Sequence, residues 1–158
     1  MEIDEPALRR DPPPMRDGEL HVVLAERVPG DAAKGWAPAY HFDVRLDGHD
    51  APVGHVNLRV GDTEHVRLYA GHVGYGVARR FRGRRLAARA TRLVLDFAHE
   101  LGMTELWITC NPDNLASLRT LEILGAERVG EVDVPPGTEM YERGETRKVR
   151  FRVRTAPA

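Results

Sequence analysis

Residues 74–87 read GYGVARRFRGRRLA, and this stretch decides the fold. It begins in a glycine-rich apolar run and ends where a helical repeat starts. From Leu86 to Leu101 apolar residues recur at helical spacing, while charged residues fill the opposite face. Gly102 then provides a helix stop. The stretch therefore predicts a strand over His72–Ala78, a tight turn and a long amphipathic helix.

Weaker patterns surround this unit. Alternating or apolar runs predict strands at Glu19–Val28, Tyr40–Leu46, Val53–Val60, Leu106–Cys110, Ala126–Val134 and Thr146–Val153. A second helix is predicted over Asn111–Leu124, with Asn111 as its cap. The order indicates an α+β (mixed α/β) fold around one mostly antiparallel sheet, in which the central strand–helix–strand unit is a right-handed parallel crossover.

Length and composition limit the possible classes of protein. The 158 residues fit one domain over residues 19–158, preceded by a proline-rich, flexible arm at residues 1–18. No run is apolar enough to span a membrane or to serve as a signal peptide. The single cysteine, Cys110, suits a reducing, cytoplasmic setting. The scattered histidines form no metal-ligand spacing, so we expect no metal site.

Five arginines, at positions 79, 80, 82, 84 and 85, crowd the turn before the long helix. A helix N-terminus carries partial positive charge and unpaired N–H groups, so arginines there are locally unfavourable. An anion in the turn would relieve this conflict, because the N–H groups and the guanidinium groups would converge on phosphate oxygens. The alternative is a solvated surface patch. In that case the arginines would have no ligand.

The segment Arg82–Ala87 resembles the pyrophosphate loop of the GNAT acetyltransferases, and residues 111–126 resemble the second motif of that family. The resemblance implies a splayed sheet flanked by helices, acetyl-CoA as cofactor, and acetyl transfer to a primary amine by direct attack. Arg85 departs from the pattern, because the family usually has a glycine there. The cofactor-binding residues that the resemblance implies are Tyr75, Gly76, Val77, Arg82, Gly83, Arg84, Arg85, Leu86, Ala87, Asn111, Asn114 and Ser117.

The resemblance also implies where the cofactor and the acceptor amine would bind. Strands 72–78 and 105–110 should splay apart, so that the pantetheine arm pairs with residues 75–77 like an added strand. Two family helices should be missing or reduced, since only Pro29–Ala39 is available for them. The acceptor side, for a small-molecule or peptide amine, should be open. Alternatively it is completed by the N-terminal arm, by the loop 135–145 or by a second subunit in a homodimer.

The catalytic residues are less well defined by the sequence. The family often places a tyrosine acid where this chain has Leu121, so Ser117 is the candidate catalytic donor. Glu64, His55 and His72 remain open as general bases. Cys110 is read as an inert buried thiol, with nucleophilic catalysis as the alternative.

Two other functions compete with catalysis. A protein with Leu121 and Arg85 at these positions could bind acyl-CoA as a sensor without turnover. The arginines with Phe81 could instead bind nucleic acid. The net charge of −1 argues against a nucleic-acid or membrane-surface binder.

Overall fold

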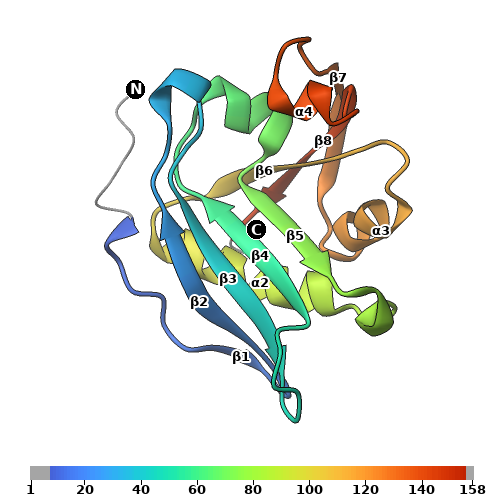
Figure 1. Ribbon diagram of the computed structural model, residues 1–158. Helices are drawn as coiled ribbons and strands as arrows, with labels where there is room; N and C mark the ends of the chain where they lie inside the picture. Colours follow the sequence, from blue (N-terminus) through green and yellow to red (C-terminus); the bar gives the residue numbers. More distant parts are fainter. Residues whose placement is uncertain (1–7, 156–158) are drawn as a thin grey trace.

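The computed structural model describes residues 8–155 and shows two sheets (Figure 1). The five-stranded sheet contains, in spatial order, β1 (Met15–Asp17), β2 (Leu20–Val28), β3 (Ala39–Leu46), β4 (Gly54–Arg59) and β5 (Val73–Val77), all antiparallel. The three-stranded sheet has the order β6 (Glu105–Cys110), β8 (Arg147–Arg154) and β7 (Glu127–Asp133). The mixed α/β class is therefore confirmed, but the single predicted sheet is divided between β5 and β6.

Helices connect and cover these sheets. The regular ones are α2 (Leu86–Glu100), α3 (Leu115–Ile123) and the short α4 (Glu139–Glu142). The described residues also form three short helical segments of other types: the π-helix η2 (Val66–Ala70) and the 3₁₀ turns η1 (Ala32–Lys34) and η3 (Arg79–Phe81). The sequence patterns missed η2 and α4. Between β2 and β3 the structure has only η1, as expected for reduced family helices. Within residues 8–155 no helix is long and apolar enough to cross a membrane.

The core lies between α2 and one face of the five-stranded sheet (Figure 1). On β3 the buried residues Tyr40, Phe42 and Val44 alternate with the more exposed His41, Asp43 and Arg45, because successive side chains of a strand point to opposite faces. Phe97 of α2 packs edge-on against the first two, with ring centroids 5.1 and 6.2 Å away. This packing fixes α2 and leaves the other face of β3 and β4 free to line a site.

The segment expected to be a flexible arm, residues 1–18, contains a short strand. Residues 1–7 lie outside the described residues, and residues 15–17 form β1, in which Met15 is buried. Arg89 of α2 holds this region, since its guanidinium donates to the carboxylates of Asp17 and Glu19 at 2.7 and 2.8 Å. The expectation of a loose arm is therefore wrong for residues 15–17. The sequence signal was missed because three residues are too few to show an alternating pattern.

Strands β5 and β6 meet at one end and diverge beyond it. The His72 N–H donates to the Trp107 carbonyl at 2.6 Å, and the Trp107 N–H donates to His72 Nδ1 at 2.9 Å. Farther along, the two strands share no sheet pairing, and Tyr75 of β5 instead reaches Ser117 of α3. The predicted splay is confirmed, and His72 holds its closed end.

His72 also links the fold to pH. Its side chain is almost completely buried, and this burial lowers its pKa to about 4. The folded protein therefore keeps the imidazole neutral, whereas the unfolded chain binds a proton below about pH 6.5. We expect the free energy of unfolding to fall as the pH drops from about 6.5 to about 4, by an amount on the order of 3 kcal/mol from this group.

The measurement is chemical denaturation across this pH range, on the wild type and on His72→Asn. The asparagine can still accept a hydrogen bond but does not titrate. The slope of its free energy of unfolding against pH should therefore be smaller, by the equivalent of about one bound proton. Equal slopes for the two proteins would show that His72 is not the titrating group.

Candidate functional site

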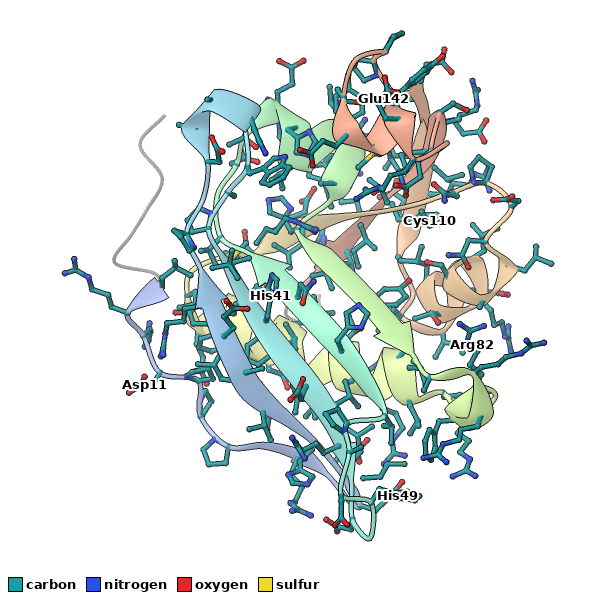
Figure 2. The ribbon with its side chains drawn as sticks, in the orientation of Figure 1. Asp11, His41, His49, Arg82, Cys110 and Glu142 are labelled. Carbon is teal, nitrogen blue, oxygen red and sulfur yellow. The ribbon has the colours of Figure 1, made fainter. Side chains whose placement is uncertain are left out.

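A cavity of about 460 Å³ lies beside β5, and we call it the first cavity. Its walls are the end of β5, the arginine-rich turn, the start of α2 and one side of α3; Figure 2 shows Arg82 near α3. Ten of the predicted cofactor residues line it: Tyr75, Gly76, Val77, Arg82, Gly83, Arg85, Leu86, Ala87, Asn114 and Ser117. Five further residues also line it, and the sequence assigned none of them to cofactor binding: Phe81, Ala116, Arg119, Thr120 and Ile123. Four of them, Ala116, Arg119, Thr120 and Ile123, lie on α3 at spacings of three and four residues. This spacing places them on one face of the helix and could have identified them.

Two of the predicted residues do not line this cavity. Arg84 stacks over the Phe81 ring, 5.7 Å from its centroid. Asn111 was expected to cap α3, but its side chain accepts a hydrogen bond from Lys148 Nζ at 2.8 Å. The cap is Asn114, whose Oδ1 accepts from the Ser117 N–H at 3.1 Å. The helix starts later than expected because Pro112 and Asp113 form a turn.

The turn before α2 is strongly and locally positive. None of its five arginines forms an ion pair with a carboxylate among residues 8–155, whereas Arg89, farther along α2, is paired with Asp17 and Glu19. The backbone N–H groups of residues 83–87 also find no acceptor in the described part of the chain. Unpaired donors and positive charge at a helix N-terminus are the features that bind phosphate groups.

Arg85 adopts a conformation that explains the glycine usual at this position in the family. Its φ is +59°, and it is the one non-glycine residue with positive φ among the described residues. It occupies the N-cap position of α2 without making a side-chain capping bond. An L-residue in this left-handed conformation costs about 1–2 kcal/mol, a cost that glycine avoids. Position 85 thus has a backbone conformation that a glycine would adopt without this cost.

Hydroxyl groups gather at the inner side of the first cavity. The Tyr75 hydroxyl lies 2.8 Å from Ser117 Oγ, and burial raises the pKa of Tyr75 to about 12. Burial also raises the pKa of the Cys110 thiol, while a hydrogen bond with Ser117 lowers it to a smaller extent. A buried thiol with a raised pKa is a poor nucleophile, which fits the inert reading of Cys110.

The position of the family's usual acid is closed to the cavity. Leu121 is fully buried in the core, so a tyrosine there would have to displace packed side chains instead of entering the cavity. Tyr75, which the sequence assigned only to cofactor binding, brings a hydroxyl to the lining of the cavity. The pairing of Tyr75 with Ser117 could not be read from positions 42 residues apart.

The three candidate bases fall in different environments. His72 is buried and its Nδ1 already accepts a backbone hydrogen bond. Glu64 is exposed beside η2. His55 lies on the outer face of β4, where its ring crosses Gly76 so closely that a Cβ there would lie 2.6 Å from it. The structure therefore gives His72 a structural role and leaves His55 nearest to β5.

A second cavity, of about 590 Å³, lies near the beginning of β5. Its walls come from the η1 segment, from the outer face of β3 and β4, from η2 and from residues 137–143. Its polar lining includes His41, Arg59 and His65, and its apolar lining includes Trp36 and Met140. The loop 135–145, one of the segments expected to complete the acceptor side, thus contributes to a real cavity.

The conformation of Arg85 leads to a test. Arg85→Gly and Arg85→Ala both remove the side chain, but only alanine keeps the strained backbone. We expect the glycine variant to be more stable than the alanine variant by about 1 kcal/mol, measured by chemical denaturation. An alanine variant of equal or greater stability would contradict the left-handed conformation.

Known proteins are similar to this chain in sequence or in fold. The acetyltransferase (GNAT) domain model matches residues 3–127. The Bacillus subtilis (strain 168) protein named "Probable N-acetyltransferase YjcK" is 32% identical over 94 residues, which are 58% of this chain. The chain spans about half the length of that relative, since the match covers 50% of it.

Solved structures agree in fold. The ribosomal-protein-S5-alanine acetyltransferase of Vibrio fischeri superposes with a TM-score of 0.65 at 14% identity, covering 90% of this chain and 96% of the other. Mycobacterium smegmatis RimJ, solved in complex with CoA-disulfide, gives 0.56 at 20% identity, covering 73% and 53%. The family match covers most of the chain, and the structures repeat its architecture. The chain belongs to the GNAT acetyltransferase domain family.

Proposed function

We propose that residues 19–158 act as one acyltransferase domain that binds acetyl-CoA in the first cavity and acetylates a primary amine. The observation that carries this proposal is the arginine turn, which lies at one end of a cavity that continues along β5. Its guanidinium groups have no carboxylate partner, and its N–H groups have no acceptor, within residues 8–155. The complex of RimJ with CoA-disulfide supports the same ligand chemistry for this fold.

The residues present fit such a ligand. Residues 82–87 would hold the phosphates through backbone N–H groups and guanidinium charge. Strand β5 pairs with β4 on one edge only, so residues 75–77 can bind an extended amide chain along the other edge. When bound, acetyl-CoA supplies a thioester that an amine attacks directly, releasing the thiol.

Tyr75 and Ser117 are suited to stabilise developing negative charge. The pKa of Tyr75, about 12, exceeds that of a cysteine-like thiol, about 8.5, so complete proton transfer from this phenol to a thiolate is uphill. The phenol stays neutral near pH 7 and can donate a hydrogen bond. We therefore assign Tyr75, together with Ser117, as hydrogen-bond donors to the leaving sulfur.

The binding of acetyl-CoA is the first test. At about 100 times the dissociation constant, a ligand should stabilise the protein by roughly 2.7 kcal/mol. A thermal-shift comparison of acetyl-CoA, CoA and a short duplex DNA measures this. An unchanged melting temperature with both CoA ligands would refute the proposal, and stabilisation by DNA alone would favour the nucleic-acid alternative.

The donor pair is the second test. Tyr75→Phe and Ser117→Ala should each keep cofactor affinity within a few-fold and lower kcat by about 10- to 100-fold, the loss expected for one hydrogen bond to a charged group. Because the two groups share one hydrogen bond, the double variant should lose less than the product of the single losses.

Tyr141→Phe, which removes an exposed hydroxyl from α4, serves as the control and should keep the wild-type rate. Wild-type turnover in Tyr75→Phe and Ser117→Ala would remove both groups from the mechanism. Binding of acetyl-CoA without acetylation of any amine, across peptide N-termini, lysines, polyamines and aminoglycosides, would support the sensor alternative.

A further inference from the structure

The second cavity holds a positive charge that no carboxylate within residues 8–155 neutralises. Three long cationic side chains line it: Lys34, Arg59 and Arg143. Lys34 pairs with Glu139 at 3.1 Å, and Arg143 pairs with Glu145 at 2.8 Å. Arg59 forms no ion pair with any carboxylate within residues 8–155, and the cavity's one acidic residue, Glu139, is already paired.

Arg59 is held in place by backbone groups. Its Nη1 donates to the carbonyls of Gly71 and Ala70 at 3.1 and 3.4 Å, directly before β5. Its Nε and Nη2 have no acceptor in the described part of the chain. Burial lowers the pKa of this guanidinium, and no carboxylate among the described residues counteracts the loss of hydration. A desolvated charge without a partner is costly, and an anionic ligand in the cavity would remove that cost.

The two cavities lie toward opposite ends of β5. The first cavity lies along Tyr75–Val77, whereas the second begins at Ala70 and at Arg59, whose backbone N–H donates to the His72 carbonyl at 2.7 Å. The five residues of β5 span about 16 Å. An extended chain that enters through the first cavity and follows β5 would therefore end near the second.

We propose that the second cavity is the acceptor site, and that its substrate is a small amine carrying a carboxylate or phosphate group that Arg59 binds. This rests on the proposed function of the first cavity. A guanidinium presents a planar fork that matches the oxygens of either anion. The volume of about 590 Å³ suits a small molecule, and Trp36, Val66 and Met140 provide apolar wall for its remaining part.

The same cavity contains groups that can take up the amine proton. His41 and His65 both line it, and Figure 2 shows His41 on the sheet face away from α2. Burial lowers the pKa of both imidazoles, and Arg59 contributes to the lowering in each case. Both rings are therefore neutral near pH 7 and can accept a proton from an amine.

The experiment compares matched pairs of amines. Natural amino acids are compared with their carboxamides, and phosphoethanolamine is compared with ethanolamine. Calorimetry measures binding to the protein saturated with CoA, and thiol release measures acetylation. The anionic member of at least one pair should bind about 10- to 100-fold more tightly than its neutral partner. The pair that shows this difference identifies carboxylate or phosphate as the recognised group.

Arg59→Met should abolish that preference, and Arg59→Lys should reduce it, because the charge stays but the fork is lost. Arg45→Met is the matched control: Arg45 lies on the same sheet face but pairs with Asp43 at 3.5 Å and lines neither cavity. It should keep the wild-type preference. A purely structural role of Arg59 would lower the melting temperature of its variants and leave the ratio between the paired amines unchanged.

Two results would overturn the proposal. One is equal binding of the anionic and neutral members of every pair by the wild type. The other is a preference that survives in Arg59→Met. Loss of CoA binding would be a separate failure, that of the proposed function, since calorimetry on the CoA-free protein still measures anion binding to Arg59.

Discussion

The pair of hydrogen bonds between His72 and Trp107 is the constraint on which the rest of this structure depends. It joins β5 to β6 at one point, so the two strands start together and then separate. Because they separate, β5 keeps one edge unpaired, and the first cavity opens along that edge. At the joined end the backbone carbonyls of residues 70–72 also accept hydrogen bonds from Arg59, which lines the second cavity. The second cavity therefore lies beside the same strand. One short strand thus borders two cavities.

The balance of charges separates these sites from the rest of the surface. Most arginines of the described residues outside them lie beside carboxylates, as Arg89, Arg147 and Arg152 do. The arginine turn and Arg59 have no such partners in the part of the chain that the structure describes. Paired surface charges contribute little to stability, but unpaired charges that are held near buried walls provide strong binding energy for an anion. We therefore expect anions to bind at these two cavities, where the backbone is also preorganised.

The sequence predicted the local elements well where a periodic pattern was long. Helix α2 follows from its helical spacing, the strands β2–β5 follow from alternating or apolar runs, and the arginine turn follows from its position before α2. The sequence could not predict contacts between distant positions. Tyr75 meets Ser117, and Arg59 lines a cavity with Met140, only because the topology folds these segments together. Leu121 shows an error of another kind. Its position in the family motif suggested that it faces the cofactor, but the orientation of α3 places its side chain in the core. Asn111 does not cap α3, because a turn at Pro112 and Asp113 delays the start of the helix; its side chain instead accepts a hydrogen bond from Lys148.

The arginine turn has a consequence for how ligands reach the protein. Five positive charges stand together on a chain whose net charge is −1, so the remainder of the chain is net negative. Such a distribution gives the molecule an electric dipole that draws polyanions toward the first cavity from solution. Ions screen this field over about 8 Å at physiological ionic strength. The rate at which a phosphate-bearing ligand associates should therefore decrease steeply with added salt, while its rate of departure, set by short contacts in the cavity, should change much less.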